Sequence, residues 1–173
     1  RVAVAVGTLT LSVGGPTRAA SSTTVSVTCM MPDLKEVVLA AAAPLSAGVS
    51  TVDASADFSV AEGTELRTAI HKGLETTDDD RDSAVIFDIK LADGTVLGDA
   101  ECVLEEMLSK GDDLASAALT VFDDSNVALG TLVCSVTAMA ALRHVQAGGG
   151  ATPAELTAPP AAPAPPPPPP PPP

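Results

Sequence analysis

The side chains that could carry out chemistry are few and widely spaced. The candidates for nucleophile, general base or zinc ligand are two histidines, His71 and His144, and three cysteines, Cys29, Cys102 and Cys134. Nucleophilic catalysis needs a Ser or Cys beside a His that a third group orients, and no set in this sequence has a supporting spacing. The cysteines show neither CxxC nor Cys/His spacing. The sequence therefore predicts no enzyme, no metal site and no cofactor.

Aspartates are the remaining candidates, because clustered carboxylates can bind calcium. Asp33 and the pair Asp112–Asp113 fall between predicted strands, but the pair lacks the Asp-x-Asp spacing that places two carboxylates on one side of a loop. The consecutive residues Asp78–Asp80 point in different directions in any regular backbone. Asp123–Asp124 is typical of a hairpin turn closed by side-chain-to-backbone bonds. Calcium binding is therefore the less favoured hypothesis.

The formal net charge of −13 excludes whole classes of partner. Nucleic acid and anionic membrane surfaces both require a Lys/Arg patch, which this composition does not supply. The charge has two remaining explanations, solubility or an acidic face that docks on a basic partner. The second explanation makes the acidic segment after the long helix a predicted partner-binding site: Asp78, Asp79, Asp80 and Asp82.

The cysteines and the first residues of the chain indicate in which cellular compartment the protein would lie. An odd number of cysteines in apolar strand contexts indicates buried, reduced thiols of a cytosolic-type compartment. An adhesion-type extracellular β-sandwich is a further alternative that such thiols disfavour. The sequence starts at Arg1 without Met, and Val2–Val13 is too short and too interrupted to span a bilayer. We interpret the chain as a fragment of a larger protein.

Alternation of apolar and polar residues predicts eight strands. Gly7 suggests a bulge in the first of them. The alanines of the third strand would suit a helix equally well, and Asp93–Gly94 indicates a hairpin between the fifth and sixth. The predicted strands are 1–13, 23–30, 36–41, 49–60, 83–91, 95–104, 117–122 and 128–136.

One helix of several turns is predicted over Thr64–Glu75, where apolar residues recur at helical spacing. Either Ser59 with Glu62, or Thr64 alone, could cap its start. Shorter helical segments are predicted over 105–110, ended by Gly111, and over 138–145. The order of elements predicts an all-β, antiparallel sandwich over residues 1–146 with helical insertions.

The tail, residues 147–173, differs in composition from the rest. It contains a glycine run, Gly148–Gly150, and then 13 of the 16 prolines, nine of them consecutive. Polyproline has no amide donors and forms a polyproline II helix, so it cannot join a sheet. The alternatives are a disordered linker or a contact with an aromatic-lined groove of the profilin or SH3 kind. For the second we name as partner-binding Pro165, Pro167, Pro169, Pro171 and Pro173.

The stretch Leu97–Val145 also resembles a known family. Its features are a Leu-Gly strand entry, a Leu-x-x-hydrophobic-Leu-x-x-Gly-x-Asp step, a Gly-x-Leu strand ending in Ser-Val, and an Ala-Leu ending. The matching residues are Leu97, Gly98, Ala100, Val103, Leu104, Met107, Leu108, Gly111, Asp113, Gly130, Leu132, Ser135, Val136, Ala141 and Leu142. They resemble the C-terminal C2 domain of the retinitis pigmentosa GTPase regulator-interacting protein family. Leu66–Arg67 and Val85–Phe87 are also similar.

This resemblance implies an eight-stranded C2-type β-sandwich in a scaffold of the ciliary base or axoneme. It implies calcium-independent binding to other ciliary or axonemal proteins in a large assembly, on the cytoplasmic side of the cilium or flagellum. The expected function is thus a non-enzymatic protein–protein interaction domain. The alternative is a calcium-regulated, membrane-docking C2 domain.

Overall fold

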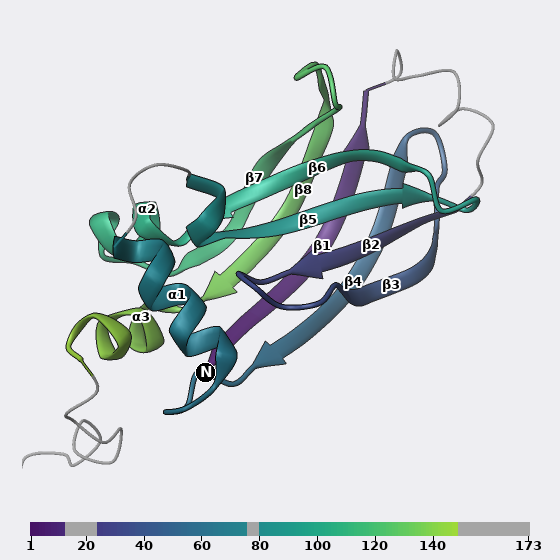
Figure 1. The fold of residues 1–173 in the computed structure, drawn as a ribbon. Helices are drawn as coiled ribbons and strands as arrows, with labels where there is room; N and C mark the ends of the chain where they lie inside the picture. Colours follow the sequence, from purple (N-terminus) through teal and green to yellow (C-terminus); the bar gives the residue numbers. More distant parts are fainter. Residues whose placement is uncertain (13–23, 76–79, 149–173) are drawn as a thin grey trace, which may run out of the picture.

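Eight antiparallel strands form a nearly closed β-sandwich in the computed structural model, which describes residues 1–12, 24–75 and 80–148 (Figure 1). The hydrogen-bonded order is β3-β2-β5-β6-β7-β8-β1-β4. The strands are β1 (Val2–Leu11), β2 (Thr24–Met30), β3 (Val37–Pro44), β4 (Val49–Phe58), β5 (Ala84–Leu91), β6 (Val96–Val103), β7 (Leu114–Phe122) and β8 (Ala128–Thr137). This confirms the predicted all-β sandwich with eight strands.

The helices are α1 (Glu65–Glu75), the short 3-10 helix η2 (Asp80–Ser83), α2 (Leu104–Lys110) and α3 (Met139–Gln146). The three α-helices gather at one end of the strands (Figure 1). Among the described residues, no helix is long and apolar enough to cross a membrane.

The alternating residues fill a single aliphatic core. Every second residue of β5 from Val85 to Leu91 is buried, and in β1 the same alternation holds on either side of the register shift after Val6. Phe87 is the largest fully buried side chain, and its cross-strand neighbours Cys29 and Ala100 are both small. The register of β1 against β4 shifts between Val6 and Thr8, which confirms the bulge predicted at Gly7.

Several predicted strand ends are wrong. β1 ends at Leu11 and β4 at Phe58. β3 starts one residue later than predicted and extends through Pro44, which pairs with Thr24. An imino acid is tolerated on β3 because that strand lies at one end of the strand order. The sequence left strand and helix open for this segment, and the structure shows a strand.

Strand β7 also starts earlier than predicted, at Leu114, and its register with β8 shifts between Leu114 and Ala117. Ser116 lies in the shifted part with a φ of 47°. The irregular segment does not alternate, so pattern analysis placed the strand start three residues late.

The long helix begins where a threonine supplies the cap. The Oγ1 of Thr64 accepts a hydrogen bond from the amide of Arg67 at 3.3 Å, so the direct cap is confirmed over the Ser59/Glu62 capping box. Gly73 lies inside the helix and is buried. A Cβ there would lie 2.4 Å from the carbonyl oxygen of Asp82, so glycine permits close packing of α1 against η2.

Candidate functional site

The predicted partner-binding residues fall mostly outside the described residues. This applies to Asp78 and Asp79 and to all five prolines of the tail, whose predicted roles stay predictions. Asp80 begins η2, and the side chain of Asp82 is exposed. The end of the acidic segment is therefore a 3-10 turn. The predicted boundary between residues 146 and 147 also stays a prediction.

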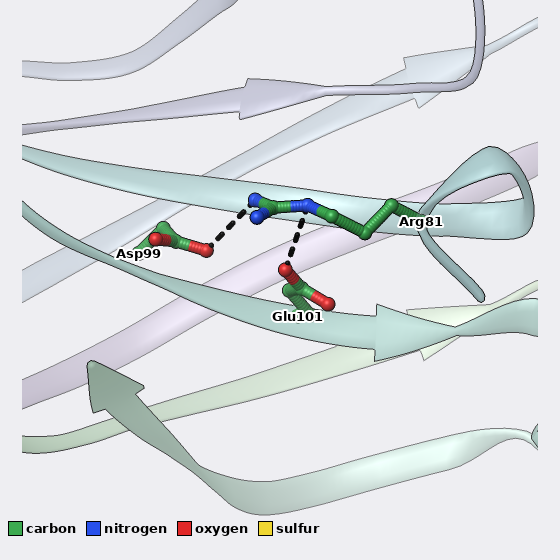
Figure 2. A network of polar contacts seen from close by, with 3 residues as sticks. All are labelled: Arg81, Asp99 and Glu101. Atoms are coloured by element: carbon green, nitrogen blue, oxygen red, sulfur yellow. Dashed lines mark hydrogen bonds and ion pairs between the residues drawn. The ribbon is translucent and has the colours of Figure 1, made fainter. Parts of the chain in front are cut away.

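The arginine of η2, Arg81, lies over the outer face of β6. Arg81 bridges two carboxylates, with Nη2 3.0 Å from Oδ2 of Asp99 and Nε 3.0 Å from Oε1 of Glu101 (Figure 2). Asp99 and Glu101 share a face because alternate residues of a strand point the same way. Figure 2 shows the guanidinium group lying between them along the strand.

A hollow of about 690 Å³ opens beside this bridge, between β6 and β7. Its charged lining consists of four carboxylates and one guanidinium, from Asp99, Glu101, Asp123, Asp124 and Arg81. Thr120, Phe122 and Asn126 complete it. We call this site the β6–β7 hollow.

The hollow opens where β6 and β7 separate beyond their one paired position in the described residues. Among the described residues, the two strands form a single pair, Asp99 with Phe122. Gly98 permits this close crossing, since a Cβ there would lie 2.3 Å from the carbonyl oxygen of Phe122. If the β6–β7 ladder continued in the same register, Glu101 would pair with Thr120. These two residues line the hollow instead.

A second set of charged side chains lies next to Asp99, on the outer face of β5. The Nζ of Lys90 bonds to Oε1 of Glu36 and lies 4.0 Å from Oδ2 of Asp88. Burial raises the pKa of the Asp88 carboxyl above its ordinary 3.8, and nearby Asp99 and Glu36 add to this effect against Lys90 and Arg81. The hydrogen bond from Lys90 lowers the pKa of Glu36 below its ordinary 4.5.

These opposite pKa shifts predict opposite pH profiles for two variants. Because the Asp88 pKa is raised on folding, its charge destabilises the fold above that pKa, and the penalty disappears below pH 3.8. Asp88→Asn should therefore increase the free energy of unfolding at pH 7, by up to about 1 kcal/mol, and leave it unchanged at pH 3. Urea denaturation at both pH values, followed by far-UV circular dichroism, measures this difference.

Glu36→Gln is the matched variant of opposite sign. The charge of Glu36 stabilises the fold above pH 4.5, and this contribution is lost as the pH falls through its lowered pKa. The variant should be less stable than the wild type at pH 7 and equal to it at low pH. Parallel profiles for the two variants would contradict this assignment.

Two of the aspartates considered for calcium, Asp113 and Asp123, have structural roles. Oδ1 of Asp113 accepts hydrogen bonds from the amides of Ala138 and Met139, at 2.7 and 2.8 Å. It thus caps the start of α3 from the loop before β7, which the sequence alone did not reveal. Oδ1 of Asp123 accepts from the amides of Ser125 and Val127, both at 2.9 Å, as predicted for a hairpin turn.

Substituting Asp113, which caps α3, should lower stability more than substituting the adjacent Asp112. Asp113→Ala leaves two helix-end amides without their acceptor and should lower the free energy of unfolding by about 1–2 kcal/mol. Asp112→Ala is the matched control, since Asp112 is exposed like Asp113 but is not the acceptor for the Ala138 and Met139 amides, and should cost less than about 0.5 kcal/mol. Equal losses in chemical denaturation would show that Asp113 does not act as a cap.

The remaining candidates do not gather into a reactive group. In residues 1–12, 24–75 and 80–148, no group of three His, Cys, Asp or Glu is placed to hold a metal ion. Burial raises the pKa of the Cys29 and Cys134 thiols to about 12 and that of Cys102 to about 11. Thiols with such pKa values remain protonated at neutral pH and are poor nucleophiles. The imidazole of His71 lies on the surface, 3.3 Å from Glu75.

Sequence reasoning missed the β6–β7 hollow. The Asp99-x-Glu101 spacing on a predicted strand was a usable signal, because it places two carboxylates on one face. Nothing in the sequence connects them with Arg81, which precedes Asp99 by 18 positions. Phe122 was expected in a strand, and its 38% exposure follows from strand alternation, since the preceding Val121 is buried in the core.

Comparison with known proteins gives a structural likeness alone. No protein-family model and no curated protein matches the sequence. Among solved structures, a C2 domain-containing protein matches with a TM-score of 0.56 and 14% sequence identity, covering 79% of this chain and 85% of that chain. At this identity the likeness shows the fold and nothing finer. Together with the antiparallel strand order described above, it shows that the chain has the C2-type β-sandwich fold.

Proposed function

We propose that the chain is a non-enzymatic protein–protein interaction domain of a larger ciliary or flagellar scaffold. The observation that carries this proposal is the β6–β7 hollow, an acidic opening between separated strands of a C2-type sandwich. Such an opening offers carboxylates and strand edges to a partner. Its lining offers no arrangement of nucleophile and base.

The ciliary part of the proposal rests on the resemblance to the retinitis pigmentosa GTPase regulator-interacting protein family. The residues that carry this resemblance are mainly packing and turn residues in the structure. Leu104, Leu132 and Leu142 are fully buried, and Gly111 ends α2 with a φ of 84°. They support a shared fold and leave the partner-binding surface to be established.

Fractionation of cilia tests the location. Cells that express the tagged parent protein are deciliated, and the cilia are extracted with non-ionic detergent. The protein should remain with the axoneme in the presence of either calcium or a chelator. Recovery in the cell body, or in the detergent-soluble membrane fraction, would overturn the proposal.

The competing hypothesis is a calcium-regulated, membrane-docking domain. Asp113 and Asp123 already accept two amide hydrogen bonds each, so these candidate ligands have structural functions. Calorimetric titration of the 173-residue chain with calcium should therefore give no micromolar binding. A micromolar response that is lost in Asp112→Ala/Asp113→Ala would favour the competing hypothesis.

A further inference from the structure

The separation of β6 and β7 leaves strand edges beside the hollow. β6 pairs with β5 along its length, and β7 pairs with β8, but in the described residues the two strands meet at one pair alone. Residues 118–121 of β7 lie just beyond that pair, opposite residues 100–103 of β6 in the same register. Strand edges of this kind bind extended peptides through main-chain hydrogen bonds.

The negative charge of the lining of the β6–β7 hollow favours a positively charged peptide. Asp99, Glu101, Asp123 and Asp124 outnumber the single cation, Arg81. Neighbouring strands in a sheet lie about 4.8 Å apart. A strand added at this edge would therefore bring alternate side chains close to the carboxylates of β6. Lys or Arg at those positions would complement the site, whereas acidic residues would be repelled.

Two other occupants are disfavoured by their own chemistry. The tail of this chain, residues 147–173, contains no Lys or Arg and one Glu, and its proline run lacks amide donors for a strand edge. A second copy of the chain carries a net charge of −13 and would be repelled at an acidic site. A basic segment of a different protein satisfies both requirements.

Arg81 shows how such a partner would be held. Its guanidinium group already contacts Asp99 and Glu101, each at 3.0 Å. The side chain of Arg81 is 52% exposed, so the bridge lies at the surface, where ion pairs are weak and exchangeable. A basic side chain from a partner would compete with Arg81 for the same two carboxylates.

We propose that the β6–β7 hollow binds an extended, Lys/Arg-bearing segment of a partner protein as an added strand, with Arg81 as an internal competitor. This inference rests on the proposed function of partner binding and names the site and the chemistry of the partner. It makes one prediction that a purely structural ion pair does not make: removing Arg81 strengthens binding.

Fluorescence anisotropy with the full 173-residue chain tests the site. The probe is a labelled twelve-residue peptide of alternating Arg and Val, at about 0.15 M salt to suppress long-range attraction. Alternating Arg and Pro keeps the charge but lacks half of the amide donors, so it should bind about tenfold more weakly. Alternating Glu and Val should not bind. Equal binding of the Arg-Val and Arg-Pro peptides would overturn the added-strand mode.

Two double variants with the same change in charge test whether the peptide binds at the β6–β7 hollow. Asp99→Asn/Glu101→Gln should weaken binding at least about tenfold. Glu62→Gln/Glu105→Gln makes the same charge change at exposed positions of the α1 approach and α2, and should change the affinity less than about twofold. Equal losses in the two double variants would overturn the proposed site.

Arg81→Gln supplies the decisive comparison. It should tighten peptide binding about threefold to tenfold, whereas Lys35→Gln, an equal charge change at another exposed residue, should alter it less than about twofold. A gain in affinity cannot arise from misfolding. Equal effects of the two variants would contradict the competitor role. If the wild-type chain binds ciliary axonemes but none of these variants alters peptide binding, the site fails while the proposed function stands.

Discussion

Phe87→Ala is expected to lower the free energy of unfolding by about 3–5 kcal/mol, a large share of the about 5–15 kcal/mol typical of natural domains. Phe87 is fully buried on β5, and its cross-strand neighbours Cys29 and Ala100 are too small to fill the space it would leave. Far-UV circular dichroism in urea measures the change, since the chain has no Trp or Tyr to report by fluorescence.

Phe122→Ala is the matched control for this substitution. It removes the same atoms from a side chain that is 38% exposed at the β6–β7 hollow, and should cost less than about 1.5 kcal/mol. Phe87→Leu, which preserves most of the volume, should cost about 1–1.5 kcal/mol. A loss below about 1 kcal/mol for Phe87→Ala would contradict the core described for this sandwich.

Gly130→Ala is expected to destabilise the fold by about 3 kcal/mol or more. Gly130 lies in β8 between β1 and β7, opposite Leu11 and Val121. A Cβ there would lie 2.0 Å from the carbonyl oxygen of Thr10 and 2.8 Å from the Cα of Leu11. Both contacts are with backbone, which cannot move aside without disturbing the β1–β8 ladder.

Gly7→Ala provides the comparison in the neighbouring strand. A Cβ at Gly7 would find the carbonyl oxygen of Val133 at 3.9 Å, an ordinary contact distance. This variant should change stability by less than about 1 kcal/mol, in either direction. Equal midpoints for Gly130→Ala and Gly7→Ala in urea denaturation would show that the β1–β8 approach is looser than described.

The sequence predicts the strands well because burial on one face enforces alternation. In β5, Val85, Phe87 and Ile89 are all fully buried, and the Asp93–Gly94 turn leads into an antiparallel β6, as predicted. The late start predicted for β7 has a local cause, the irregular register around Ser116. Pattern analysis detects periodicity, so it fails where the ladder is irregular.

The candidate site was harder to predict because contacts between distant segments form it. The acidic segment drew attention as a run of aspartates, whereas the structure makes its arginine the residue that contacts β6. Asp113 likewise caps a helix 25 positions later in the chain. Local patterns cannot contain such pairings, since these depend on how the strands cross in three dimensions.

The most direct test of the central claim, calcium-independent binding to ciliary proteins, is a rebinding measurement. Purified 173-residue chain is added to axonemes from which the native protein has been extracted with salt, and the bound fraction is determined by sedimentation. Saturable rebinding is expected, with equal affinity in calcium and in a chelator. Failure to bind axonemes, with calcium-dependent sedimentation on anionic vesicles instead, would contradict it.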